Sequence, residues 1–225
     1  AQICYRLDGI PLSIELAAAR VTMLSPEQIA AQLKECFQIL TGGSRTALPR
    51  QQTIRASIDW SWNLLTDAEQ TLFRRLAVFS GGWTIEGAEA VINEDEGIDG
   101  LLGLVNKSLV NVDEQSGAVR YRYLETIRQY AMDKLLESGE AVESRNRQLD
   151  YVLKLTGTAE HGMFFRSQPL AWLDQMEVEH DNLRAALEWS ASNHPARAID
   201  LALALDSFWA LRDYNSEAVA LCQPI

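Results

Sequence analysis

The sequence predicts a mainly α-helical protein that contains one short β-hairpin. Apolar residues recur every three to four positions through most of the 225 residues, which is the period of helices that bury one face. Between Val110 and Tyr123 the pattern changes to alternation around a glycine, which is typical of two antiparallel strands. Capping-box sequences at Ser25 and Thr66 indicate where two of the helices begin.

Composition and charge limit the classes of function. Hydrophobic residues make up 47% of the chain, which is enough for a substantial core. Twenty Lys and Arg against 31 Asp and Glu give a formal net charge of -11 at pH 7, and such a chain repels a phosphate backbone. Three cysteines without metal-like pairing are typical of reduced thiols, and no apolar run is long enough for a membrane span. We therefore expect a soluble, cytoplasmic protein, and the missing initiator methionine suggests a fragment of a larger one.

Residues 1–45 are predicted to form a small helical bundle. A first helix follows Pro11, with apolar residues on one face at Leu12, Leu16, Ala19 and Met23. A second helix is expected to begin at the Ser25 capping box and to run to Leu40. Residues 41–52 contain glycines and a proline without an apolar period, which predicts a linker.

Residues 51–80 are predicted to form two helices joined by a very short turn. Their apolar positions are Ile54, Ile58, Trp62 and Leu65 before the turn, and Leu72, Phe73, Leu76 and Phe79 after it. The second helix should begin at Thr66, whose hydroxyl can accept from the N-H of Glu69 while that carboxylate accepts from the N-H of Thr66. We expect Gly81 and Gly82 to end it, and Trp62 and Phe73 to lie in the core.

The next segment supplies the rest of a winged helix-turn-helix pattern. Thr84 should cap a short helix to Val91, and a further helix should begin at Asp99. The hairpin follows, with its turn expected over residues 113–117, and a last helix over residues 125–138 buries Ile127, Tyr130, Ala131 and Leu135. Helices, a two-stranded wing and a closing helix predict a winged-helix domain over residues 46–140.

Residues 141–225 are predicted to be entirely helical. Successive amphipathic segments lie around residues 149–156, 169–176, 183–190 and 195–211, and none shows the alternation of a strand. Helices of similar length that follow one another in this way predict the start of an antiparallel helical-repeat array, which resembles tetratricopeptide arrays.

The segment LPRQQTIRASIDWSWNLLTDAEQTLFRRLAVFSGGWT resembles the opening of the winged helix in NB-ARC proteins, the STAND class of signalling ATPases, in their bacterial transcriptional-regulator branch. Upstream, LDGIPLSIELAAARVTMLSPEQI is similar to the end of their nucleotide-binding module. Downstream, VNKSLV, RYRYLETIRQYA and EHDNLRAALEW are similar to the same branch. The resemblance covers residues 3–210 and implies that residues 1–45 are the helical arm of the nucleotide-binding module.

The resemblance also implies a nucleotide-binding role for Gly9 and Pro11. They would form the GxP motif, whose proline packs against the adenine of a bound nucleotide. The alternative is that Pro11 is only a proline at the first helical position after a turn glycine. Either way, the chain lacks the P-loop sequence G-x-x-x-x-G-K-[ST], so we expect no ATPase activity and no catalytic residues in it. ATP or ADP and magnesium belong to the full-length parent, and no cofactor is expected here.

A second family motif departs from the usual pattern. Many relatives carry Met-His-Asp just before the last helix of the winged helix, and the histidine meets the nucleotide phosphate. The positions here are Tyr123, Leu124 and Glu125. Because leucine has no donor for a phosphate, the inhibitory contact is either absent or built from other residues such as Arg122 or Arg128.

His180, flanked by Glu177, Glu179 and Asp181, is the only cluster that could suggest a metal site. A metal-binding helix usually carries a second histidine three or four residues away, and none is present. We interpret the cluster as a helix start with solvated charges.

Two functions remain open. The first is a regulatory and interaction fragment of a nucleotide-switched STAND ATPase, which relays nucleotide state through the winged helix to a helical-repeat sensor. Its partners would be the P-loop module of the same polypeptide and an inducer, protein or small molecule, but neither nucleic acid nor membrane. The second is a winged helix that binds DNA directly. Charge favours the first, because residues 50–140 hold nine Lys or Arg against fifteen Asp or Glu, and the candidate recognition helix, residues 99–107, holds one basic side chain.

Overall fold

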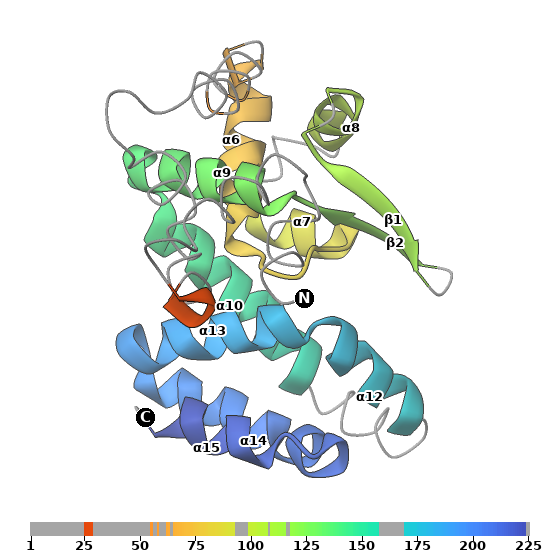
Figure 1. The fold of residues 1–225 in the computed structure, drawn as a ribbon, viewed down its shortest axis with the longest axis vertical. Helices are drawn as coiled ribbons and strands as arrows, with labels where there is room; N and C mark the ends of the chain where they lie inside the picture. Colours follow the sequence, from red (N-terminus) through yellow and green to blue (C-terminus); the bar gives the residue numbers. More distant parts are fainter. Residues whose placement is uncertain are drawn as a thin grey trace. The chain divides into compact units, whose positions relative to one another are not determined.

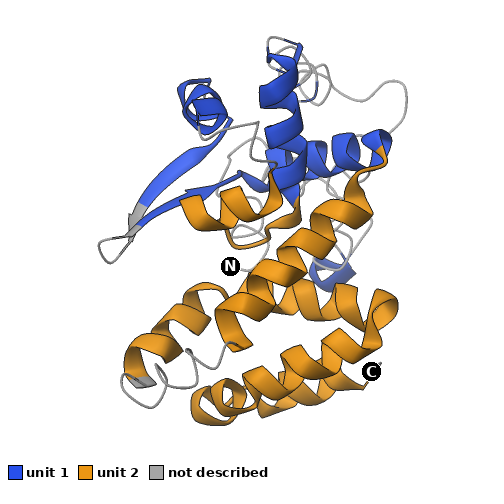
Figure 2. Ribbon diagram, turned by 180° about the vertical axis from the view of Figure 1, so that it is seen from behind, with its two compact units in different colours: residues 1–77, 96–138 blue, residues 78–95, 139–225 orange. Residues whose placement is uncertain are grey.

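The computed structural model describes residues 25–28, 55, 58, 62–63, 65–92, 99–107, 109–115, 118–157 and 169–223. This part of the chain is mainly helical and contains a two-stranded antiparallel sheet, as predicted (Figure 1). The chain divides into two compact units (Figure 2). Unit 1 comprises residues 1–77 and 96–138, and unit 2 comprises residues 78–95 and 139–225.

The predicted bundle over residues 1–45 lies outside the described residues except at its second helix start. There the Ser25 hydroxyl accepts from the Gln28 N-H at 3.2 Å, and the Gln28 side-chain oxygen accepts from the Ser25 N-H at 2.8 Å. These reciprocal bonds form the capping box that the sequence predicts.

Helix α6, Asp67–Arg75, begins at the predicted capping box. The Thr66 hydroxyl accepts from the Glu69 N-H at 3.3 Å, and the Glu69 carboxylate accepts from the Thr66 N-H at 2.8 Å. The helix does not continue to the glycines, because it tightens into the 3-10 helix η3, Leu76–Val78. The expected stop at Gly81 and Gly82 is therefore corrected: the helix has already ended, and Gly82, at a φ of 87°, instead turns the chain before the next helix.

Among the described residues, unit 1 also contains α8, Asp99–Asn106, strands β1, Asn111–Gln115, and β2, Ala118–Arg122, and α9, Glu125–Ser138. In the hairpin Val112 lies opposite Tyr121 and Gln115 opposite Ala118. The predicted turn over residues 113–117 was therefore too long, because ladder pairing continues through Gln115. Helix α9 has the predicted bounds and the predicted buried face.

The core of unit 1 is built around Phe73, which is fully buried. Its ring lies 5.6 Å from that of Trp62, 5.2 Å from that of Tyr123 and 6.3 Å from that of Tyr130, measured between centroids. The burial of Phe73 is as predicted, but Trp62 is only partly buried. The indole packs on the rings of Phe73 and Tyr130, and the Lys134 ammonium lies 5.8 Å from its centroid.

Unit 2 contains α7, Ile85–Val91, and the helices of the C-terminal half: α10, Ala141–Gly157, α12, Pro169–Val178, α13, His180–Asn193, α14, Pro195–Arg212, and α15, Asn215–Cys222. Thr84 caps α7 as predicted, since its hydroxyl accepts from the Gly87 N-H at 3.3 Å. Helices α10, α13 and α14 pack against one another, and α7 packs on α10. None of the described helices is both long and apolar enough to cross a membrane.

The grouping of α7 with the C-terminal helices cuts across the predicted domain boundary at residue 140. Compactness of the fold and boundaries of functional domains are different properties, so the division into residues 1–45, 46–140 and 141–225 stays a prediction. What the fold adds is that residues 78–95 pack with residues 139–225.

Candidate nucleic-acid interface

Helix α8 occupies the position of the recognition helix in the winged helix-turn-helix pattern. Leu101 and Leu104 are buried on the side that packs on α6. Leu102 points away and is 55% exposed. Helix α8 therefore buries one face only, and its exposed face carries a large apolar side chain.

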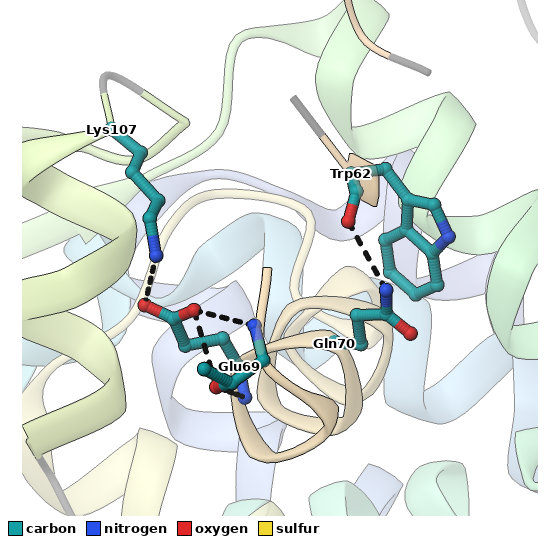
Figure 3. Close-up of polar contacts among 5 residues, drawn as sticks. Trp62, Glu69, Gln70 and Lys107 are labelled. Carbon is teal, nitrogen blue, oxygen red and sulfur yellow. Dashed lines mark hydrogen bonds and ion pairs between the residues drawn. The ribbon is translucent and has the colours of Figure 1, made fainter. Parts of the chain in front are cut away.

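Lys107, immediately after α8, forms an ion pair with the Glu69 carboxylate of α6 (Figure 3). Its ammonium donates to Glu69 Oε1, while Glu69 Oε2 accepts from the Thr66 N-H at 2.8 Å and from the Thr66 hydroxyl at 3.2 Å. One buried carboxylate thus serves both the cap of α6 and the end of α8. The amide of Gln70 donates to the carbonyl of Trp62 at 3.1 Å, which ties α6 to the residues before it.

The electrostatics of Glu69 follow from these contacts. Burial raises the energy of its charged form, but the hydrogen bonds and charge of Lys107 and the bonds from Thr66 outweigh burial, so its pKa lies below the ordinary value of 4.5. A carboxyl whose pKa is lowered by folding stabilises the folded state above its ordinary pKa. That contribution is lost as the pH falls through and below 4.5.

We expect Glu69→Gln to destabilise unit 1 by about 1 kcal/mol at pH 7, because the amide can still accept from Thr66 but cannot pair with the ammonium of Lys107. The difference from the wild type should shrink as the pH is lowered through 4.5, and urea unfolding from pH 7 to pH 3 measures it. Glu188→Gln, which removes an exposed i,i+4 pair with Arg184, is the control and should change stability by no more than about 0.5 kcal/mol throughout. A difference for Glu69→Gln that does not change with pH would contradict the role given to its charge.

The wing also presents apolar side chains. Val112 on β1 is 47% exposed and Val119 on β2 is 44% exposed. The strand register places both on the face that carries Tyr121, since residues opposite each other in an antiparallel pair share a face. On the other face Arg122 lies 4.0 Å from Asp113.

The three residues at the positions compared above with the Met-His-Asp motif of NB-ARC proteins are engaged in the fold of unit 1. Tyr123 is buried and its hydroxyl donates to the carbonyl of Phe73 at 2.9 Å, and burial raises the pKa of this phenol well above 10.0. Glu125 accepts two hydrogen bonds from Arg128, both at 2.8 Å. Leu124 lies between them, half-buried. Arg128, one of the alternatives for a phosphate contact, is therefore the bidentate partner of a carboxylate.

The other site predictions fall differently. Gly9 and Pro11 lie outside the described residues. His180 is within hydrogen-bond distance of Glu217, 2.9 Å from Nε2 to Oε1, and its ring stacks on Tyr214 at 4.5 Å. Glu179 is buried, so the interpretation of solvated charges at this helix start is wrong for that residue. Within the described ranges there is no group of three or more His, Cys, Asp or Glu that could hold a metal ion.

Glu179 immediately precedes α13, and a side chain of that helix supplies a donor to its buried carboxylate. The amide Nδ2 of Asn182 lies 2.6 Å from the Glu179 carboxylate. A buried carboxylate is tolerated when such a bond replaces water. The sequence offered no sign of this, since acids at a helix start are usually solvated.

Residues 65–136 match the model of the winged helix-turn-helix domain. The chain is 47% identical over 226 residues to provisionally named HTH-type transcriptional regulators of Mycobacterium tuberculosis and Mycobacterium bovis, a match that covers 97% of this chain and 25% of each regulator. It is also 47% identical over 146 residues to an uncharacterised protein of Mycobacterium tuberculosis, covering 62% of this chain and 37% of that protein. No solved structure matches the chain significantly. The chain thus contains a winged helix-turn-helix domain and spans about a quarter of the length of the regulators that it matches.

Proposed function

We propose that this chain is a regulatory, protein-contacting segment of a longer transcriptional regulator, and that its winged helix packs on other protein surfaces and does not read DNA. The observation that carries the proposal is the pairing of Lys107 with Glu69. Lys107 is the only basic residue of the recognition segment, residues 99–107, and it is bound to a carboxylate of the same domain.

Binding to DNA through Lys107 would break this ion pair. Duplex affinity comes largely from Lys and Arg side chains that neutralise phosphates. If Lys107 turned to a phosphate, the carboxylate of Glu69, whose side chain is 10% exposed, would lose its cation. The exposed groups that remain on the two elements expected to meet a duplex include Leu102, Val112 and Val119, and these apolar side chains suit a protein surface.

The finer form of the proposal follows the resemblance to NB-ARC proteins. The longer polypeptide would be a cytoplasmic STAND ATPase whose P-loop module holds ATP or ADP and magnesium, with Gly9 and Pro11 at the adenine. The winged helix would relay the nucleotide state to the helices of unit 2, which would act as a tetratricopeptide-like sensor of an inducer. The alternative, direct DNA binding, is favoured by the match of residues 65–136 to the winged helix-turn-helix model.

Fluorescence anisotropy with labelled duplex DNA distinguishes the two functions. The whole chain is titrated at low salt, where electrostatic binding is strongest, and we expect no submicromolar association. The variant Glu69→Gln, which releases Lys107 from its carboxylate, should also fail to bind. Submicromolar, salt-sensitive binding that Lys107→Ala weakens would overturn the proposal and establish the DNA-binding alternative.

A positive test uses the polypeptide that the parent gene encodes before this segment. Calorimetry should detect its binding to the chain, and Leu102→Asp should weaken that binding at least tenfold, because a charge replaces apolar contact. Leu203→Asp, at an exposed leucine of unit 2, is the matched control. Equal effects of the two changes would remove α8 from the contact surface.

A further inference from the structure

Two buried amide side chains fasten the segment before α7 to the C-terminal helices. We infer that Gln148 of α10 and Asn182 of α13 form a clamp on residues 78–82, and that this clamp makes α7 move with the C-terminal helices of unit 2. Helix α7 would then follow the movements of the C-terminal helices, although it lies within the residues that match the winged helix-turn-helix domain. This inference concerns the mechanics of the fold and does not require the function proposed above.

The amide of Asn182 is fully buried and uses its whole hydrogen-bonding capacity. Its oxygen accepts from the N-H of Ser80 at 2.9 Å and from that of Gly81 at 3.3 Å. Its nitrogen donates to the carbonyl of Gly82 at 2.8 Å and to the carboxylate of Glu179 at 2.6 Å. An amide offers two acceptor and two donor positions, so the side chain is matched to this turn of backbone and to the buried acid.

Gln148 continues the clamp from α10. It is 1% exposed, and its amide nitrogen donates to the carbonyl of Val78 at 3.0 Å. Backbone groups of residues 78, 80, 81 and 82 are therefore bonded to side chains of two C-terminal helices, in a stretch that runs from Val78, the last residue of η3, toward the start of α7. Val78 and Gly82 are buried, and their carbonyls would be costly to bury without these partners.

Apolar packing and close approach act in the same place. The ring of Phe79 meets that of Tyr151 of α10 edge-on at 6.3 Å. A Cβ at Gly81 would lie 3.1 Å from the Cβ of Asp181, so glycine lets this backbone approach α13 closely. A Cβ at Gly87 of α7 would lie 3.5 Å from ring atoms of Phe79 and Tyr151. The segment and α7 are thus fitted to α10 and α13 by shape as well as by hydrogen bonds.

The consequence is mechanical. Val78 is joined to α6 through the η3 turn, so the backbone held by the clamp is continuous with the helix that carries Phe73 and Glu69. A rearrangement of α10 and α13, such as one produced by a ligand or partner on the helical array, would move residues 78–82 and α7 with them. This movement would be transmitted to α6 through the continuous backbone.

Hydrogen exchange of the whole chain tests the clamp. In Asn182→Ala we expect the amides of Ser80 and Gly81 to exchange at least tenfold faster, and α7 to lose protection together with them, while α8, β1 and β2 keep theirs. Asn193→Ala is the matched control, because it lies on the same helix and its exposed amide donates only to the carbonyl of Trp189. It should leave residues 80–91 unchanged.

Two outcomes would overturn the inference. If α7 keeps its protection when Ser80 and Gly81 lose theirs, the clamp does not carry α7. If α8 and the hairpin lose protection to the same extent as α7, then α7 opens with unit 1 and does not move with the C-terminal helices alone.

A pair of conservative variants covers the case in which Asn182→Ala does not fold. Asn182→Asp places a second carboxylate against Glu179 and should lower the Tm markedly. Adding Glu179→Gln supplies an amide that donates to the new carboxylate, so the double variant should regain about half of the lost Tm, with only the carbonyl of Gly82 left unserved. Failure of the second change to recover any stability would show that the amide and the acid do not bond as described.

Discussion

Phe73→Ala should lower the free energy of unfolding of unit 1 by about 3 to 5 kcal/mol, the usual effect of removing a buried aromatic side chain. Phe73 is fully buried, and its ring contacts three other aromatic rings. Because domains are stable by only about 5 to 15 kcal/mol, this variant should lose a large share of the stability of unit 1. Urea unfolding followed by tryptophan fluorescence measures the change.

Trp62→Ala is the informative comparison. The sequence places Trp62 and Phe73 alike on apolar stripes, whereas the structure leaves the indole partly exposed beneath the ammonium of Lys134. We therefore expect Trp62→Ala to be at least about 1 kcal/mol less destabilising than Phe73→Ala. Equal losses, or a larger loss at Trp62, would mean that the aromatic cluster is not centred on Phe73. Because Trp62→Ala removes a fluorophore, the two variants should be compared by circular dichroism.

Much of the fold could be predicted because its signals are local. The capping boxes at Ser25 and Thr66 involve residues three positions apart, and the structure contains the bonds in both. Helix α9 lies between a strand and Gly139, whose φ of 76° is unfavourable for other residues. Both ends of this helix could therefore be predicted from the sequence. The bundle over residues 1–45 and the nucleotide motif at Gly9 and Pro11 stay predictions.

The errors arise where distant parts of the chain meet. The side chain of Glu179 was expected in water, but the amide of Asn182 holds it inside, and that amide also binds backbone about a hundred positions earlier. The hairpin was predicted with too long a turn, because Asp113 and Glu114 are poor strand residues by propensity and their pairing across the ladder decides their conformation.

The candidate interface was predictable in position and not in chemistry. The order of elements located α8 and its single basic residue, Lys107. Glu69 was assigned only to the cap of α6, and nothing in the sequence indicated that its second oxygen binds Lys107, 38 positions away. The sequence does not reveal that α8 turns Leu102 outward, because neighbouring leucines of an apolar helix compete for the same buried face.

The ion pair of Glu69 and Lys107 also limits which side chain fits at Gly103 of α8. Gly103→Ala should destabilise unit 1 by about 1 to 3 kcal/mol, although alanine is the better helix former by about 1 kcal/mol. A Cβ at this position would lie 2.2 Å from Glu69 Oε1. The carboxylate cannot swing aside freely, since it is held by Lys107 and by Thr66. Moving it breaks a helix cap worth about 0.5 to 2 kcal/mol and charge-assisted bonds worth about 1.5 to 3 kcal/mol.

Gly100→Ala gives the matched control within α8. The added methyl there would lie 3.1 Å from the terminal Cδ2 of Leu72, which can shift by a few tenths of an ångström, so this variant should stay within about 1 kcal/mol of the wild type. A double-mutant cycle then isolates the clash, because Glu69→Ala removes the carboxylate that the new methyl would strike. In that background Gly103→Ala should become neutral or stabilising by up to about 1 kcal/mol, through helix propensity alone. If Gly103→Ala changes stability as little as Gly100→Ala in the presence of Glu69, the carboxylate does not lie between α6 and α8. It would then no longer follow that Lys107 is bound to Glu69 and does not contact DNA.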